Sequence, residues 1–142
     1  MLTRFNSIPV VIGLRLYSLT PIVAGMAWSV VGTSLFEDWF IGLDESDRAR
    51  IEDRVNLLEQ LGPTLGRPVV DSIKASRHRN MKELRSGSLR FLFIFDPVST
   101  AVLLLGGVKR DRWRAWSELA ISTADDLYDD YLLETKQTTG DT

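Results

Sequence analysis

The sequence predicts an α+β domain built on a small antiparallel sheet. Three observations carry this prediction: a short alternating run near residue 28, helical periodicity over residues 34–61, and three strand-like runs joined by hairpin-length turns over residues 80–105. A final helical pattern follows residue 113. Helices and strands that form separate runs, instead of a strict alternation, are typical of α+β folds. A chain of 142 residues suits one such domain.

The first 25 residues differ from the rest of the chain. Their apolar runs are interrupted by Pro9, Arg15 and Pro21, and they contain no acidic residue. A membrane span needs about 20 consecutive apolar residues, which these interruptions prevent. The charge of Arg15 also interrupts the apolar stretch that a secretory signal requires. We therefore expect residues 1–25 to be an N-terminal extension outside the functional protein, which would begin at Met26.

The first strand and helix of the domain are expected directly after this extension. Residues 27–31 alternate apolar and small side chains, which is the pattern of a half-buried strand. Ser34 and Glu37 have the spacing of a capping box, in which a hydroxyl and a carboxylate satisfy free backbone N–H groups at a helix start. Gly42 then suits the left-handed position that ends a helix.

A second, longer helix is predicted from a cap at Asp44 to about Leu61. Ile51, Val55 and Leu58 form its apolar face at i, i+4 and i+7, while the charged residues between them face water. The two helices form a hairpin, and the Gly- and Pro-rich segment after Leu61 is a loop.

Three strands in a meander are expected next, joined by short turns at residues 86–88 and 96–100. The second strand is apolar on both faces except at Arg90, which identifies it as a central strand covered on both sides. Gly107 is expected to end the last strand close to another element. The strands are Asn80–Arg85, Leu89–Phe95 and Ala101–Leu105.

The remaining residues are predicted to be helical. Two tryptophans lie three residues apart, and an apolar stripe follows a cap at Ser122 or Thr123. The stripe consists of Leu127, Tyr128 and Tyr131. The domain thus covers residues 26–134, and the polar residues 135–142 are expected to form a frayed tail.

Charge is distributed unevenly along the chain, although its net value is only -2. Residues 67–114 contain 11 basic and 4 acidic residues, a balance of +7, and the other residues contain 6 and 15, a balance of -9. A basic segment of this kind favours a polyanion partner, because each neutralised phosphate releases counterions. The alternative interpretation is a solvated surface.

Metal, cofactor and disulfide chemistry are disfavoured by the composition. The chain has no cysteine and one histidine, so it lacks the usual ligands of a zinc site, and no glycine motif has the spacing of a nucleotide-binding loop. We expect no metal and no cofactor. Four aspartates over residues 125–130 look like a magnesium-binding box, but we interpret them as a solvated acidic helix face.

Five cations of the meander are expected to meet at one edge of the sheet, because short hairpins bring the strand ends together. Arginine rarely enters a central strand without a partner, so this convergence favours an anionic ligand. The alternative is that each cation faces solvent or pairs with Glu83 or Asp111. The five are Lys82, Arg85, Arg90, Lys109 and Arg110.

The order of three short motifs resembles the RelE/HigB family of toxin–antitoxin toxins, in its phage-derived HigB-like branch. The motifs are Lys82-Glu-Leu-Arg85, Leu89-Arg90-Phe-Leu-Phe and Leu103-Leu-Leu-Gly-Gly-Val-Lys109-Arg110. Their ordered combination carries the resemblance, which extends over about residues 26–133. It implies a RelE/ParE-like fold with an N-terminal strand, a helix pair, a three-stranded meander and a C-terminal helix.

The resemblance implies a metal-independent endoribonuclease that cleaves messenger RNA, usually on the ribosome, in the cytoplasm. It also implies a cognate HigA-like helix-turn-helix antitoxin, which silences the toxin and joins it in repressing their operon, so that operator DNA is contacted only through the antitoxin. No membrane partner is implied. Arg85, Arg90 and Lys109 match the basic catalytic positions of the family, and Lys82 lies beside them as a fourth catalytic candidate.

The chemistry expected of this set follows from what each side chain can do. Arginine stays protonated, so Arg85 and Arg90 would bind phosphate and stabilise charge. Proton transfer would fall to Lys82, Lys109 or His78, or to Tyr128, because Phe93 and Phe95 stand where many members of the family have tyrosine. Cleavage would leave a 2′,3′-cyclic phosphate. Further RNA contacts are expected from Arg77, His78, Arg79 and Arg110.

Two alternatives of other classes remain open. The same fold resembles ParE toxins, which inhibit DNA gyrase by binding and have no nuclease chemistry. A third interpretation is an inactive member that only binds its antitoxin. The cationic set at Arg85, Arg90 and Lys109 favours the ribonuclease, because gyrase inhibitors tend to lack it.

Overall fold

The computed structural model describes residues 2–4, 28–97, 100–109 and 113–140. Six strands form one sheet in the order β1-β2-β6-β5-β4-β3. Three helices and one short 3-10 helix, η2, complete the described part of the chain. The strands are β1 (Leu2–Arg4), β2 (Ser29–Thr33), β3 (Val70–Ser72), β4 (Met81–Ser86), β5 (Leu89–Asp96) and β6 (Thr100–Val108). The helices are α3 (Ser34–Ile41), α4 (Glu45–Leu61), η2 (Gly62–Thr64) and α5 (Trp113–Gly140).

The meander predicted from the sequence is confirmed as β4, β5 and β6, which pair antiparallel in that order. The expectation of a wholly antiparallel sheet is wrong, because β2 lies parallel to β6, with Ser29 opposite Thr100. An alternating pattern determines which side chains of a strand are buried but not the direction of its neighbour. The sheet is therefore mixed, and the fold class remains α+β.

Two of the strands, β1 and β3, are not predicted by the sequence. β3 has only three residues and pairs with β4, with Val70 opposite Leu84. β1 lies within residues 1–25 and pairs antiparallel with β2 at the other edge of the sheet. Strands of three residues are too short to show a periodic pattern.

The predicted caps are wrong for α3 and correct at the start of α4. Thr33, not Ser34, caps α3: its Oγ1 accepts a hydrogen bond from the N–H of Phe36 at 3.1 Å. Gly42 has φ -74°, so the prediction of a left-handed closing residue is wrong there. The predicted cap of α4 is confirmed, since Asp44 Oδ1 accepts from the N–H of Asp47 at 2.8 Å.

The C-terminal helix is one continuous element. The cap predicted at Ser122 or Thr123 is wrong, because α5 passes through both residues. Its buried residues keep helical spacing across this point and include Ala120, Ala124 and Tyr128. The continuous apolar stripe explains why no cap is needed. The helix also covers residues 135–140, which the sequence assigns to the tail.

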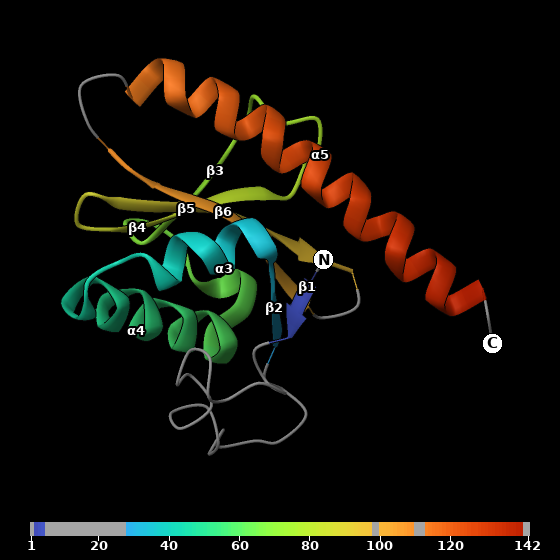
Figure 1. Cartoon of the computed structure of the whole chain (residues 1–142), viewed down its shortest axis with the longest axis horizontal. Coiled ribbons are helices and arrows are strands. Elements are labelled where there is room, and N and C mark those ends of the chain that lie inside the picture. The colour runs from blue at the N-terminus through green and yellow to red at the C-terminus, as the bar shows by residue number, and fades with distance from the viewer. Residues whose placement is uncertain (1, 5–27, 98–99, 110–112, 141–142) are drawn as a thin grey trace.

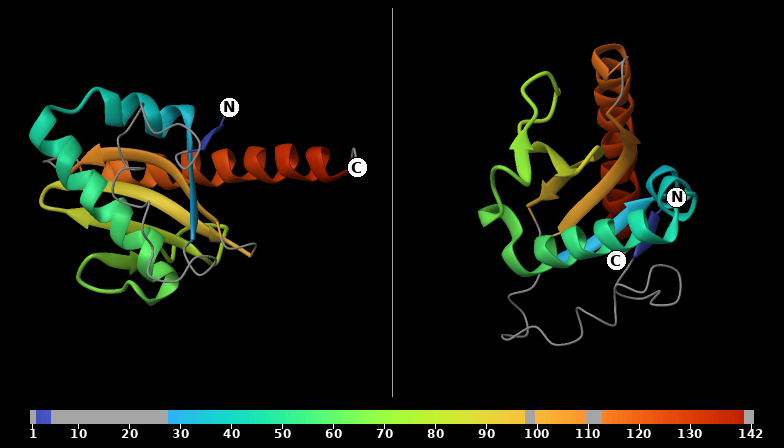
Figure 2. Two further views of the ribbon diagram at one scale, coloured as in Figure 1. Left: turned by 90° about the horizontal axis from the view of Figure 1, so that it is seen from below. Right: turned by 90° about the vertical axis from the view of Figure 1, so that its left-hand side faces the viewer.

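The sheet separates two cores, with α3 and α4 on one face and α5 on the other (Figure 1). The central strand β5 contributes to both: Phe91, Phe93 and Phe95 pack toward α3 and α4, while Leu92 and Ile94 pack under α5. This confirms the prediction of a central strand covered on both sides. Figure 2 shows the C-terminal half of α5 running beyond the sheet.

The two glycines near the end of β6 allow helices to approach the sheet from both sides. A Cβ atom on Gly106 would lie 2.3 Å from the ring of Trp39 on α3. A Cβ atom on Gly107 would lie 2.2 Å from the ring of Trp116 on α5. The expected close packing at Gly107 is thus confirmed, and only glycine fits at either position without movement of an indole ring.

Candidate functional site

Arg85 and Arg90 are cross-strand neighbours on the β4–β5 hairpin. Side chains alternate along a strand, and Met81 of β4 and Leu92 of β5 are buried under α5. Arg85 and Arg90 therefore point to the α5 face of the sheet. The sequence correctly predicts that these two cations come together.

One carboxylate lies between the two arginines. Glu83 Oε1 accepts a hydrogen bond from Arg85 Nε at 2.9 Å and lies 3.9 Å from Arg90 Nε. The side chains of Glu83 and Arg90 are only 11% and 12% exposed. The hydrogen bond that Arg85 donates to Glu83 is the largest cause that raises the pKa of Arg85 above its ordinary value. Glu83 thus permits two like charges to lie side by side.

The short strand β3 adds a second carboxylate to this cluster. Asp71 Oδ2 accepts from Arg85 Nη2 at 3.2 Å, and its Oδ1 accepts from Arg67 Nε at 3.0 Å. The bond from Arg67 and the bond from the N–H of Ser72 lower the pKa of Asp71. Sequence reasoning missed Asp71, since no pattern predicts β3 beside β4.

Arg90 is also held by the turn that precedes it. Its Nη1 donates to the carbonyl oxygens of Gly87 at 2.5 Å and Leu89 at 2.9 Å. Gly87 has φ +61°, a conformation that glycine adopts at little cost in such a turn. The guanidinium group is therefore positioned by both the backbone and Glu83.

Lys82 is not brought together with the two arginines. It precedes Arg85 by three residues on β4 and therefore lies on the opposite face of the strand, where its Nζ donates to Ser72 Oγ at 2.9 Å. Lys109 lies two residues beyond Gly107, the cross-strand neighbour of Arg90, and its N–H donates to the carbonyl of Ser88 at 2.8 Å. Arg110 lies outside the described residues.

The loop between β3 and β4 positions Arg77 and His78 against α5. Arg77 Nη2 donates to Asp126 Oδ1 at 3.1 Å and to Asp129 Oδ2 at 2.5 Å. His78 Nε2 lies 2.9 Å from Asp129 Oδ1. Arg79 on the same loop is exposed and forms no ion pair within the described part of the chain.

Aspartates of α5 hold this loop, so the interpretation of a solvated acidic face is correct only in part: Asp126 and Asp130 are exposed, but Asp125 is buried. Asp125 is only 2% exposed and accepts hydrogen bonds from the hydroxyl of Ser76 and from the N–H of Arg77 at 3.1 Å. The hydrogen bond from Arg77 is the main cause of the lowered pKa of Asp129. The sequence cannot predict this contact, because its partners are about 50 residues apart.

Tyr128 belongs to the core of the same contact. It is buried, its ring centroid lies 4.8 Å from that of His78 in an edge-on arrangement, and burial raises its pKa. The described residues contain no group of three or more His, Cys, Asp or Glu side chains that could hold a metal ion. No described helix is long and apolar enough to cross a membrane.

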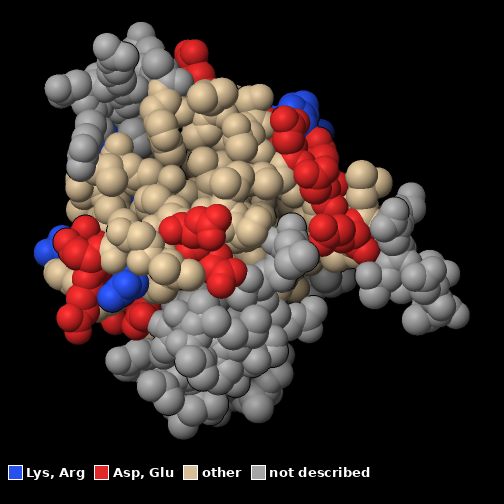
Figure 3. Space-filling model, viewed as in Figure 1, with Lys and Arg blue, Asp and Glu red and all other residues tan. Residues whose placement is uncertain are grey.

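Ion pairs in the fold offset some of the positive charge of residues 67–114. Arg77 is matched by three aspartates, and Arg85 by Glu83 and Asp71. Figure 3 shows one face of the molecule, on which acidic side chains lie along α5 and over α3 and α4, with few basic ones. On this face the described cations form no broad basic surface.

Comparison with known proteins agrees with the resemblance in the sequence. The family described as phage-derived protein Gp49-like matches residues 38–129. The chain is 46% identical over 98 residues to HigB3, a candidate toxin of Mycobacterium tuberculosis H37Rv, and this covers 68% of the chain and 86% of HigB3. It is 40% identical over 105 residues to HigB2, a candidate toxin of the same organism, which covers 70% of the chain and 52% of HigB2.

A solved structure is also similar. It is the crystal structure of the toxin–antitoxin complex RelBE2 from Mycobacterium tuberculosis, with a TM-score of 0.49 and 16% identity, covering 58% of this chain and 99% of the other. The extent of the family match and the identity to HigB3 carry the assignment. The chain therefore belongs to the phage-derived Gp49-like family, in the HigB/RelE group of toxin–antitoxin toxins.

Proposed function

We propose that this chain is a toxin that cleaves messenger RNA through the ribose 2′-OH, without a metal ion, and that a cognate HigA-like helix-turn-helix antitoxin neutralises it. The observation that carries the proposal is the Arg85–Arg90 pair, held by Glu83 on one face of the sheet. Two adjacent guanidinium groups match the geometry of a phosphate. Membership of the HigB/RelE group supports RNA as the source of that phosphate.

The proposed reaction is an internal transfer at phosphorus. The 2′-OH gives its proton to a base, its oxygen bonds to phosphorus, and the bond from phosphorus to the 5′-oxygen breaks as that oxygen takes a proton. The products are a 2′,3′-cyclic phosphate and a 5′-OH. Arg85 and Arg90 would stabilise the charge on the pentacoordinate phosphorus, and Lys109, beyond the strand position opposite Arg90, is the proposed group for proton transfer.

Product analysis of cleaved RNA tests this function. The full chain, released from its antitoxin, is incubated with free messenger RNA in the presence of EDTA, and in a separate arm with messenger RNA on ribosomes in a buffer that contains Mg²⁺. We expect cleavage that EDTA does not abolish and fragments with 5′-OH ends. Fragments with 5′-phosphate ends would contradict the mechanism, and growth arrest with SOS induction but no RNA cleavage would indicate a ParE-like gyrase inhibitor instead.

A further inference from the structure

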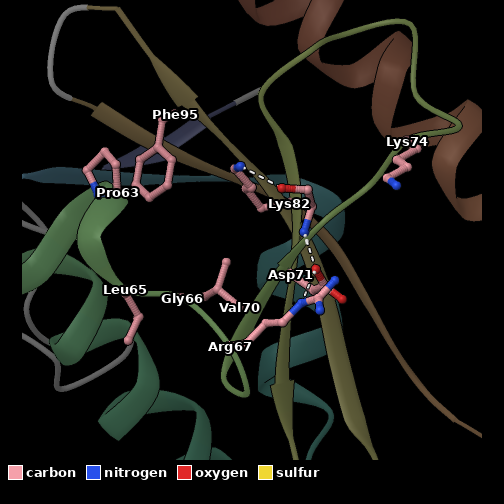
Figure 4. Close-up of a pocket in the computed structure, with 10 residues that line it drawn as sticks. Pro63, Leu65, Gly66, Arg67, Val70, Asp71, Lys74, Lys82 and Phe95 are labelled. Carbon is pink, nitrogen blue, oxygen red and sulfur yellow. Dashed lines mark hydrogen bonds and ion pairs between the residues drawn. The ribbon is translucent and has the colours of Figure 1, made fainter.

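A cavity of about 520 Å³ lies at the β3 edge of the sheet, beside η2 (Figure 4). Lys82, which lines it, lies on the face of β4 opposite to the Arg85–Arg90 pair. This volume is within the range of small-molecule sites, which is about 300–1,000 Å³. The cavity is therefore a second candidate site, which shares Arg67 and Asp71 with the edge of the arginine cluster but neither Arg85 nor Arg90.

One side of the cavity is polar and carries positive charge. Lys82 Nζ donates one hydrogen bond to Ser72 Oγ at 2.9 Å, and an ammonium group has three donors, so two remain. The hydroxyl of Ser72 accepts from Lys82 and keeps its own proton to donate. Neither Lys82 nor Lys74, which also lines the cavity, forms an ion pair with any described residue. These groups suit an anion.

Asp71 also lines the cavity but does not cancel the charge of Lys82. Its carboxylate accepts from Arg67 Nε, from Arg85 Nη2 and from the N–H of Ser72. Arg67, which also lines the cavity, already balances this one negative charge, and Arg85 shares its charge between Asp71 and Glu83. The local balance of the cavity remains positive.

The other side of the cavity is apolar. Pro63, Leu65 and Phe95 form it, and Figure 4 shows the rings of Pro63 and Phe95 next to each other. The ring of Trp28 packs against Phe95 with a centroid distance of 5.0 Å. Gly62 allows this packing, because a Cβ atom there would lie 2.2 Å from Trp28 Nε1. A planar apolar group could pack against this side of the cavity.

We propose that this cavity binds a nucleotide, with the phosphate on Lys82 and Ser72 and the base against Pro63 and Phe95. A nucleotide combines an anion with a flat ring, which are the two chemistries that the cavity presents. The nucleotide is either free or one unit of an RNA strand. The inference does not depend on nuclease activity, since the cavity shares neither Arg90 nor Lys109 with the proposed catalytic set.

Titration of the full chain with 5′-AMP, followed by amide NMR and calorimetry, tests this proposal. We expect shifts at Gly66, Ser72 and Phe95, and about tenfold weaker binding in Lys82→Gln, which loses a charge-assisted hydrogen bond. Gly66→Leu adds a side chain where no atom lies within 4 Å of the Cβ position, and should abolish binding while the fold is kept. The matched charge control is Arg50→Gln, on exposed α4 surface, which should bind as the wild type does.

Three further ligands test the phosphate contact, the base contact and the RNA source separately. Adenosine and inorganic phosphate should each bind at least tenfold more weakly than 5′-AMP; equal binding of either one would overturn the two-part site. A short 2′-O-methyl RNA, which cannot be cleaved through its 2′ position, identifies an RNA source if it shifts the same amides. Absence of shifts with 5′-AMP, or wild-type affinity in both Lys82→Gln and Gly66→Leu, would also overturn the proposal. Nucleotide binding without RNA cleavage would contradict only the proposed function.

Discussion

Arg85 on β4 lies in register with Arg90 on β5, and a single carboxylate oxygen of Glu83 is within 4 Å of both guanidinium groups. Two unpaired arginines at this spacing would repel each other in a partly buried site. Glu83 and the carbonyl groups of the hairpin turn offset that repulsion. The hairpin thus presents a preorganised pair of cations on the α5 face of the sheet.

Replacement of Arg90 should remove cleavage without loss of the fold. We expect Arg90→Ala to lower the rate of RNA cleavage by about 10²–10³, as is typical when one group that stabilises transition-state charge is removed. Arg90→Lys should recover only part of the rate, because lysine cannot bind phosphate through two parallel bonds. Single-turnover rates measure this effect, with Arg50→Gln as the control. Equal rates in Arg90→Ala and the wild type would exclude Arg90 from the site.

Glu83→Gln should destabilise the protein. The change leaves Arg85 and Arg90 adjacent without the shared carboxylate, and we expect the free energy of unfolding to fall by about 1–2 kcal/mol, less than for a fully buried pair because Arg85 is 39% exposed. Urea unfolding measures the loss. Glu45→Gln, at an exposed position on α4, should change stability by less than about 0.5 kcal/mol. A neutral effect of Glu83→Gln would show that the arginines tolerate each other without it.

The contact between α5 and the loop of residues 73–80 should depend on Asp125. Asp125→Ala removes the acceptor of the Ser76 hydroxyl and of the Arg77 N–H, both at a nearly buried site. We expect a loss of about 1–3 kcal/mol and faster hydrogen exchange in this loop. Asp130→Ala, at an exposed position on the same helix, is the matched control. Unchanged exchange in the loop would mean that other contacts hold it.

Acid should weaken the β3 edge through Asp71. Its pKa is lowered in the folded protein, first by the hydrogen bond from Arg67. A carboxylate of this kind contributes stability above its unfolded pKa, about 3.9, and the contribution is lost as the pH falls through the folded value. We expect the Asp71 pKa, measured by carboxyl NMR, to rise toward its ordinary value in Arg67→Ala and to stay low in Arg50→Ala. A pKa that does not respond to Arg67 would remove this arginine as the main cause.

Gly107→Ala should push α5 away from the sheet. The added methyl group would lie 2.2 Å from the ring of Trp116, so the indole must move, at a cost of about 1–3 kcal/mol. Thermal unfolding and tryptophan fluorescence report the change. Gly66→Ala is the control, because its methyl group would meet nothing within 4 Å. Similar melting of the two variants would contradict the tight contact between Gly107 and Trp116.

Local patterns predicted the parts of this fold that depend on neighbours in sequence. The apolar repeat of Ile51, Val55 and Leu58 identified α4, and the doubly apolar run of β5 identified the central strand. Caps were less predictable, because Thr33 and Ser34 are both good capping residues. Thr33 is selected by its position at the end of β2, where its hydroxyl also bonds to the carbonyl of Leu104.

The sequence by itself determined the fold class, the meander and the adjacency of Arg85 and Arg90, because helix periodicity and short hairpins act over a few residues. Alternation along the predicted strand also separates Lys82 from Arg85, three residues later, although the expected convergence of five cations overlooked it. Only the tertiary structure decided that the aspartates of α5 bind Arg77 and His78, across about 50 residues of chain. Such distant pairings depend on packing of the whole domain, which no local pattern encodes.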